Sequence, residues 1–183
     1  MITMQAVADR VEIEALRAEV IDAVMMRDFD RFTSLFTPDG AMRWPHIGKE
    51  FVGREEIRAG IEWGQGLWDF FVQNVHPGVV RLDGDTADGR VYIEEFGRLR
   101  NGSSHLNHAL YHDRYRRTAD GWRFSERVYE VRYADSAALA GAPPPAAGTR
   151  ILMETDSPPS ASHRGPGGRA HPTPFTRDQE SHR

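Results

Sequence analysis

One histidine, His76, has the surroundings expected of a residue that moves protons. It lies in the stretch Gln73–Asp85, just before an apolar run that is typical of a β-strand and ends in an Asp-Gly-Asp turn. The imidazole of histidine titrates near neutral pH, so a histidine at the mouth of a strand and beside a cavity can take up and release protons during a reaction. We therefore treat His76 as a candidate general base.

A second group of histidines, His105, His108 and His112, raises the question of a metal site. His108 and His112 share one face of the strand expected over residues 106–117, because alternate residues of a strand point the same way. Arginines occupy the same face, which indicates a surface turned to solvent or to a partner. No carboxylate or cysteine at a fitting spacing accompanies the histidines, so we predict no metal site.

Composition excludes several classes of function. The chain has 183 residues, no cysteine and a formal net charge of −4. This length allows one domain with a sizeable core, while the lack of cysteine excludes disulfides and thiolate sites. The sequence has no dense basic patch, no apolar run near the roughly 20 residues of a membrane span and no apolar signal core in residues 1–10. We expect a cytoplasmic protein whose partners include neither nucleic acid nor membrane.

The composition changes at about Ala134. Eight of the eleven prolines follow this point, together with a single aromatic residue, Phe175. Such a segment buries too little apolar surface to offset the entropy lost on ordering, so we predict that residues 134–183 are mostly disordered. The apolar stretch Arg150–Glu154 is the candidate for a short ordered segment, with a chance apolar patch as the alternative.

Hydrophobic periodicity predicts helices first and strands afterwards. Apolar residues recur at intervals of three and four over residues 7–26, which favours an amphipathic helix, and similar arguments predict helices over 30–36 and from 53 toward 68. Strands are predicted over residues 41–44, 72–82, 86–99, 106–117 and 122–133. This order indicates an α+β domain over residues 1–133, with helices packed on one face of an antiparallel sheet.

Three segments, Arg27–Gly40, His76–Ala87 and Tyr111–Phe124, occur in order and at suitable spacing. Together they resemble the SnoaL-like branch of the nuclear-transport-factor-two-like superfamily, over roughly residues 5–133. The resemblance implies a cone-shaped fold, in which N-terminal helices wrap a strongly curved sheet around one internal pocket. It also implies catalysis without a metal or organic cofactor, and a homodimer formed through the outer face of the sheet.

Dehydratases and dehydrochlorinases of this superfamily use a histidine at the start of the corresponding strand as the base, and the resemblance assigns that role to His76. An aspartate on the first long helix normally orients the histidine, but its position falls on Met25. Methionine cannot stabilise an imidazolium, so either the pair of histidine and carboxylate is absent or another carboxylate replaces the aspartate. The candidates are Asp22 and Asp113, with Glu94 and Glu95 on strands that should also line the cone.

The resemblance directs the odd-numbered face of residues 106–117 into the pocket. Tyr111 would then donate a hydrogen bond to a substrate carbonyl or enolate oxygen, or would act as an aromatic core residue. Ala109 would line the pocket beside it. Asp113 would orient His76 or would instead form a structural salt bridge with Arg114, Arg127 or Arg132.

Aromatic residues are concentrated in the middle of the chain. In a cone fold they would form the mouth and walls of an apolar cavity, together with Met25. This richness favours a flat, polycyclic or terpenoid-like ligand over a sugar or nucleotide. The aromatic residues concerned are Trp44, Trp63, Trp68, Phe70 and Phe71.

We therefore predict a cofactor-independent enzyme for dehydration, elimination or isomerisation of a small hydrophobic carbonyl compound of polyketide, steroid or terpenoid type. Two alternatives remain open on the same fold, a polyketide or polyether cyclase and a non-catalytic ligand-binding domain. A cyclase fits methionine at position 25 somewhat better, since its pocket mainly holds a reactive substrate in a productive shape.

Overall fold

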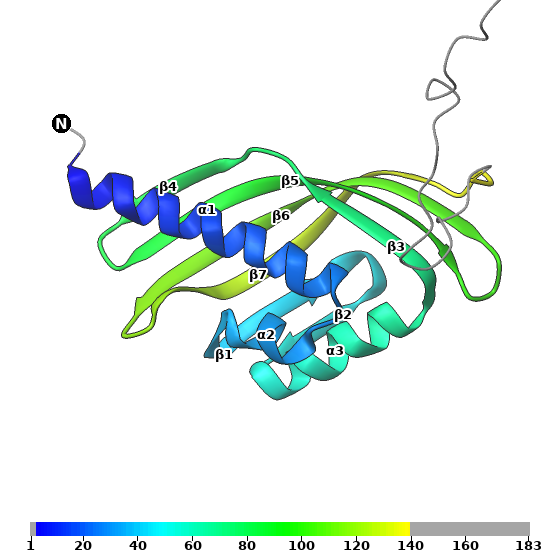
Figure 1. Cartoon of the computed structure of the whole chain (residues 1–183), viewed down its shortest axis with the longest axis horizontal. Coiled ribbons are helices and arrows are strands. Elements are labelled where there is room, and N and C mark those ends of the chain that lie inside the picture. The colour runs from blue at the N-terminus through cyan, green and yellow to red at the C-terminus, as the bar shows by residue number, and fades with distance from the viewer. Residues whose placement is uncertain (1–2, 140–183) are drawn as a thin grey trace, which may run out of the picture. The chain divides into compact units, whose positions relative to one another are not determined.

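Three α-helices and a seven-stranded sheet make up residues 3–139, the part of the chain that the computed structural model describes (Figure 1). The helices are α1 (Met4–Met25), α2 (Phe29–Ser34) and α3 (Arg54–Gly66), with a short 3₁₀ helix, η1 (Pro45–Ile47). The strands are β1 (Phe36–Trp44), β2 (Lys49–Val52), β3 (Trp68–Val75), β4 (Val79–Asp83), β5 (Thr86–Leu99), β6 (Ser104–Thr118) and β7 (Gly121–Asp135). The ordered segment predicted over 150–154 and nearly all of the predicted tail lie outside the described residues.

The sheet has the order β2-β1-β7-β6-β5-β3, and β4 also pairs with β5. It is curved and does not close into a barrel (Figure 1). All strand pairs are antiparallel except β1 with β7, which run parallel. The α+β class and the curved sheet wrapped by helices are thus confirmed, while the parallel pair was not foreseen.

The single strand predicted over residues 72–82 is wrong, because the chain forms two strands there. Val75 pairs with Ile93 and Val79 pairs with Arg90, so β3 and β4 follow one another along the same edge of β5. Four residue steps on one side match three on the other, which leaves one extra residue as a bulge. Pro77 lies in this break, where its missing N–H costs no ladder hydrogen bond.

Helix α1 crosses one face of the sheet (Figure 1). The side chain of Thr3 caps its start by accepting a hydrogen bond of 3.1 Å from the backbone N–H of Ala6. The buried face runs through Ile13, Val20 and Val24. Burying each such side chain contributes about 1.5–3 kcal/mol, so this face holds the helix on the sheet. Val7 and Val11, the first apolar residues of the predicted helix, are exposed.

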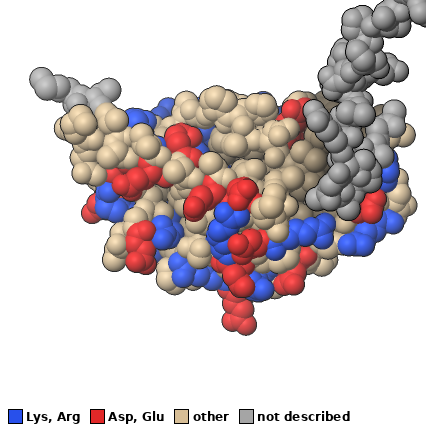
Figure 2. Space-filling view, in the orientation of Figure 1, with Lys and Arg blue, Asp and Glu red and all other residues tan. Residues whose placement is uncertain are grey.

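Acidic and basic side chains are interspersed over the face shown in Figure 2, with no broad area of one sign. None of the helices in residues 3–139 combines the length and the apolar character needed to span a membrane.

Candidate functional site

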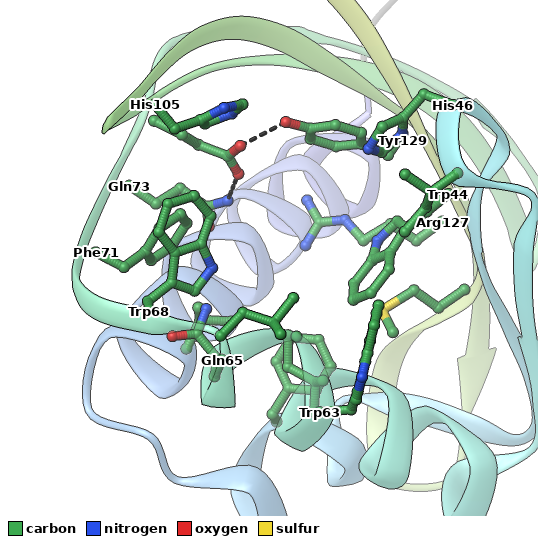
Figure 3. A pocket seen from close by; sticks show the side chains of 18 of the residues that line it. Trp44, His46, Trp63, Gln65, Trp68, Phe71, Gln73, His105, Arg127 and Tyr129 are labelled. Atoms are coloured by element: carbon green, nitrogen blue, oxygen red, sulfur yellow. Dashed lines mark hydrogen bonds between the residues drawn. The ribbon is translucent and has the colours of Figure 1, made fainter. Parts of the chain in front are cut away.

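A cavity of about 270 Å³ lies between the helices and the inner face of the sheet. Its wall is mainly apolar and includes the aromatic side chains of Trp44, Trp63, Trp68 and Phe71 (Figure 3). The ring centroids of Trp68 and Phe71 are 5.0 Å apart, and those of Trp44 and Trp63 are 6.4 Å apart. Such an enclosure suits a small apolar ligand, which few polar groups would then orient.

One carboxyl group, that of Glu95, faces this apolar space from β5. Glu95 pairs across the sheet with Gln73 of β3 and with Asn107 of β6, so all three side chains point to the same inner face. The Glu95 carboxyl accepts hydrogen bonds from the amides of Gln73 and Asn107, the latter at 2.5 Å, and from the hydroxyl of Tyr129 on β7. Three strands therefore fix one carboxyl group.

The surroundings of Glu95 change its acidity. Its side chain is almost completely buried, with 7% of the residue exposed. Burial raises the pKa of Glu95 above its ordinary value, because a charged carboxylate loses its hydration; the three hydrogen bonds and the charge of Arg127 oppose this effect only in part. A carboxyl group with a raised pKa can exchange protons closer to neutral pH.

Arg127 adds a positive charge to the same cavity. Its guanidinium binds Asp113 through Nε at 3.0 Å and Nη2 at 3.4 Å, and both side chains are buried. It also packs on the ring of Tyr111, 3.9 Å from the ring centroid. In Figure 3 the guanidinium points into the cavity. Within residues 3–139 its remaining nitrogen, Nη1, has no hydrogen-bond acceptor, so it can donate to a ligand.

The structure places His76 outside this cavity. It follows β3 at the break before β4, where its backbone N–H donates to the carbonyl of Tyr92 at 2.9 Å. Its side chain is 51% exposed, and its Nε2 lies 3.8 Å from a carboxyl oxygen of Glu94. Phe71 and Gln73, which do line the cavity, have the opposite parity on the strand. The placement of the predicted base in the pocket is therefore corrected.

The carboxylates predicted to assist His76 also lie elsewhere. Asp22 is exposed on α1 and binds Arg31 at 2.5 Å. Asp113 makes the structural salt bridge with Arg127 that was the alternative for it. Met25 faces β3, and its sulfur accepts a 3.3 Å hydrogen bond from the backbone N–H of Gln73. Met25 therefore contacts Gln73, and neither of these two residues has a side chain that can ionise.

Some of the other predicted pocket residues line the cavity and some do not. Tyr111 lies in the cavity wall with the four aromatic residues named above. Ala109 is buried behind the wall, in a small cluster with Ile93 and Tyr129. The three histidines of β6 do not converge, since His105 faces the cavity whereas His112 binds Glu130 at 2.6 Å on the outer face.

Several cavity residues were not assigned from the sequence, namely His46, Gln65, Gln73, His105, Arg127 and Tyr129. Glu95 was named only as one of several carboxylates. The alternation of residues in β5 could have distinguished it, because Glu95 follows Val91 and Ile93 on the buried face of this strand. An ionisable residue at such a position needs buried partners, and these partners mark the site.

The sequence model of the SnoaL-like domain family matches residues 5–128. The chain belongs to the SnoaL-like domain family. An uncharacterized protein of Mycobacterium tuberculosis is 28% identical over 132 residues, which are 70% of this chain and 88% of that protein. The family assignment thus extends over nearly all of the described residues.

Solved structures share the SnoaL-like fold of this chain. LinA superposes with a TM-score of 0.72 at 24% identity, over 79% of this chain and 100% of that one. The hexachlorocyclohexane dehydrochlorinase LinA-type3 from Novosphingobium barchaimii gives 0.68 at 23% identity, over 75% and 97% of the two chains. At these identities the likeness establishes a common fold, and the chemistry has to be argued from the cavity.

Proposed function

We propose that this SnoaL-like protein is an enzyme that transfers a proton on a small hydrophobic carbonyl compound, in an elimination, dehydration or isomerisation. The observation that carries the proposal is the buried carboxyl of Glu95, held by three side-chain donors at the edge of an aromatic cavity. Glu95 takes the role of base that the sequence had assigned to His76.

The reaction begins when the Glu95 carboxylate removes a proton from the carbon next to the substrate carbonyl. Negative charge then develops on the carbonyl oxygen, and Nη1 of Arg127 donates a hydrogen bond to it. In an isomerisation, Glu95 returns the proton to a different carbon. In an elimination, the electron pair forms a carbon–carbon double bond and expels a stable anion from the next carbon, while Glu95 keeps the proton until it is released to water. In a dehydration, Glu95 passes the proton to the departing hydroxyl, which leaves as water. A well-placed acid–base group contributes about 10²- to 10⁴-fold to the rate of such a step.

The charges of the cavity favour an uncharged substrate. Arg127 is already neutralised by Asp113, so a substrate carboxylate would meet an electrostatically compensated arginine and the Glu95 carboxylate beside it. The aromatic wall stabilises a flat, apolar body. The volume of about 270 Å³ lies just below the usual range for drug-sized ligands, roughly 300–1,000 Å³, which favours a compound of one or two rings.

The comparisons support this class of chemistry without naming the substrate. A dehydrochlorinase, as its name states, removes hydrogen chloride, which includes the removal of a hydrogen from carbon. In the present chain His76, the expected base, lies outside the cavity, and Met25 stands where its acidic partner was expected and contacts the backbone of Gln73, so we assign the proton transfer to Glu95.

Hydrogen exchange tests the proposal without knowledge of the natural substrate. The protein is incubated with indanone and other small cyclic ketones in deuterated buffer, and the loss of the proton signal next to the carbonyl is followed by NMR. We expect exchange above the buffer rate, a loss of about 10²-fold or more in Glu95→Gln, and an unchanged rate in His76→Gln. Equal exchange by wild type and Glu95→Gln would exclude Glu95 as the base.

A cyclase or a non-catalytic binding domain is the second candidate, and the contact of Met25 with Gln73 favours it, because neither residue can move a proton. In that case the cavity serves to hold a ligand in shape. The ketones would then bind without exchange, and Glu95→Gln would change their affinity rather than a rate.

A further inference from the structure

The two oxygens of the Glu95 carboxyl have different surroundings. Oε2 accepts hydrogen bonds from Nδ2 of Asn107 at 2.5 Å and from the hydroxyl of Tyr129. Within residues 3–139, Oε1 accepts a single hydrogen bond, from Nε2 of Gln73 (Figure 3). Each oxygen of a carboxylate has two lone pairs, so both lone pairs of Oε2 are occupied, whereas one lone pair of Oε1 is free.

Oε2 of Glu95, Asn107 and Tyr129 form a closed triangle of hydrogen bonds. Its third side joins Nδ2 of Asn107 to the hydroxyl of Tyr129, also at 2.5 Å. The amide of Asn107 supplies two hydrogens and the hydroxyl of Tyr129 supplies one, so three hydrogens fill the three sides. A proton on Oε2 would be a fourth hydrogen, and one of the three bonds would then break. The triangle therefore stabilises an ionised Oε2.

The orientation of the Asn107 amide agrees with an ionised Oε2. The Oδ1 atom of Asn107 is buried and has no hydrogen-bond partner in the part of the chain that the structure describes. If Oδ1 and Nδ2 exchanged places, Oδ1 would gain the hydroxyl of Tyr129 as a donor, but it would also meet the carboxylate oxygen without a hydrogen between them. Asn107 thus leaves its own acceptor unpaired, at a cost in free energy, and binds Glu95 instead.

Tyr129 stays a hydrogen-bond donor, because burial raises its pKa above the ordinary value and the charge of Glu95 adds to this effect. Other ionisable groups of residues 3–139 reach the cavity wall from η1, β6 and β7, and none does so from the α-helices, β1 or β3. These groups are His46 of η1, His105 and Tyr111 of β6, and Arg127 of β7 with its partner Asp113 of β6.

We infer that Asn107 and Tyr129 are positioning residues for the proposed base, which hold Oε2 of Glu95 so that Oε1 takes the proton of the substrate. This inference rests on the proposed function, since it specifies the atom that receives the proton. The free lone pair of Oε1 forms the new O–H bond, and the electron pair of the broken C–H bond stays on the substrate. Gln73, which lines the cavity, keeps its hydrogen bond to the other lone pair of Oε1.

The pH profile of hydrogen exchange tests the inference. Exchange of indanone in deuterated buffer is measured at low ketone concentration, where the profile reports ionisations of the free protein. In Tyr129→Phe the Glu95 carboxylate loses a donor, so the midpoint of the profile should rise by about one pH unit. The plateau at high pH should fall about tenfold or more, because Oε2 is no longer held in place. Asn107→Leu, of similar volume, should move both quantities in the same directions.

The plateau separates positioning from basicity. A carboxylate with a higher pKa is a stronger base, so the loss of a donor without a loss of orientation would raise the plateau. A plateau that stays or rises, or a midpoint that stays, overturns the inference; if Asn107→Leu does not fold, Tyr129→Phe decides. Tyr92→Phe removes an exposed hydroxyl from the same strand as Glu95 and should keep the wild-type profile.

Carbon NMR of the Glu95 carboxyl gives a reading that requires no turnover. The signal is identified by its loss in Glu95→Gln, and it separates the titration of Glu95 from those of His46 and His105. Its midpoint should rise in Tyr129→Phe and stay in Tyr92→Phe, and equal midpoints overturn the inference. If Glu95→Gln leaves the exchange intact, the proposed base and the inference both fall. If Glu95→Gln abolishes the exchange and Tyr129→Phe changes neither midpoint nor plateau, the inference alone is rejected.

Discussion

The guanidinium of Arg17 donates from Nε to the hydroxyl of Tyr115 at 2.8 Å, and both residues are 1% exposed. The same hydroxyl donates to Asp113 at 2.9 Å, and Asp113 in turn holds Arg127. A continuous buried chain of polar groups therefore runs from the middle of α1 to the cavity. Gly89 leaves room for it, since a Cβ there would lie 2.5 Å from Nη2 of Arg17.

Removal of one hydroxyl should interrupt this chain. In Tyr115→Phe, Nε of Arg17 loses its acceptor and Asp113 loses a donor, and an unsatisfied buried polar group costs about 1–3 kcal/mol. We expect the free energy of unfolding to fall by this amount in urea denaturation. Tyr133→Phe removes the hydroxyl of a tyrosine that is 53% exposed on the same sheet, and it should change stability by less than about 0.5 kcal/mol. Equal effects of the two substitutions would contradict the buried chain.

The salt bridge between Arg127 and Asp113 should show the asymmetry of buried ion pairs. Arg127→Met leaves a buried carboxylate without its counter-ion, which typically costs about 3–5 kcal/mol. The double variant Arg127→Met with Asp113→Asn removes both charges and should recover part of the loss. Chemical denaturation of the two variants and of Asp113→Asn completes a double-mutant cycle. A double variant no more stable than Arg127→Met would show that the unpaired charge is not the cause.

The raised pKa of Glu95 predicts a particular dependence of stability on pH. The folded state holds the Glu95 proton more tightly than the unfolded state does, so the free energy of unfolding falls as pH rises from the ordinary value of 4.5 to the raised pKa. Glu95→Gln lacks this decline, and its stability relative to wild type should increase through that range. Glu94→Gln, which keeps Glu95, should follow the wild-type curve. Parallel curves for wild type and Glu95→Gln would refute the raised pKa.

Two glycines of α3 should respond in opposite ways to the same substitution. A Cβ on Gly60 would lie 2.7 Å from the ring of Phe51, which packs edge-on against Trp44 of the cavity wall. Gly60→Ala should therefore cost about 1–3 kcal/mol through overpacking. No heavy atom lies within 4 Å of a Cβ on Gly66, so Gly66→Ala should be neutral or stabilising by up to about 1 kcal/mol. Thermal unfolding of both variants distinguishes a steric effect from a general effect of alanine.

Strand parity explains which parts of the fold could be read from the sequence. Within β6 the alternation is unbroken, so Tyr111 and Asp113 lie on the inner face and His108 and His112 on the outer face, as the count of residues predicts. Between β3 and β4 the count fails, because the bulge inserts one residue and reverses the faces beyond it; His76 therefore points away from the cavity, whereas Val80, of the same parity, is buried.

The choice of Glu95 among the carboxylates required pairings that the sequence does not display. Glu94 and Glu95 are neighbouring residues of the same type. Only Glu95 points to the inner face, where it binds Gln73 and Asn107, which lie 22 and 12 residues from it in the sequence. Arg127 could be foreseen as a partner of Asp113 but not as a wall of the cavity. Both roles depend on the register of neighbouring strands, a long-range property.

The tryptophans of the cavity also allow ligand binding to be followed by the intrinsic fluorescence of the protein. Three of its four tryptophans, Trp44, Trp63 and Trp68, line the cavity, while Trp122 is buried elsewhere and donates to Asp9 at 3.2 Å. Most of the tryptophan side chains of the protein therefore lie beside the space that a ligand would occupy. Ligands can be screened by the change in tryptophan emission with unlabelled protein, and Trp122 provides an internal reference that occupancy of the cavity should leave almost unchanged.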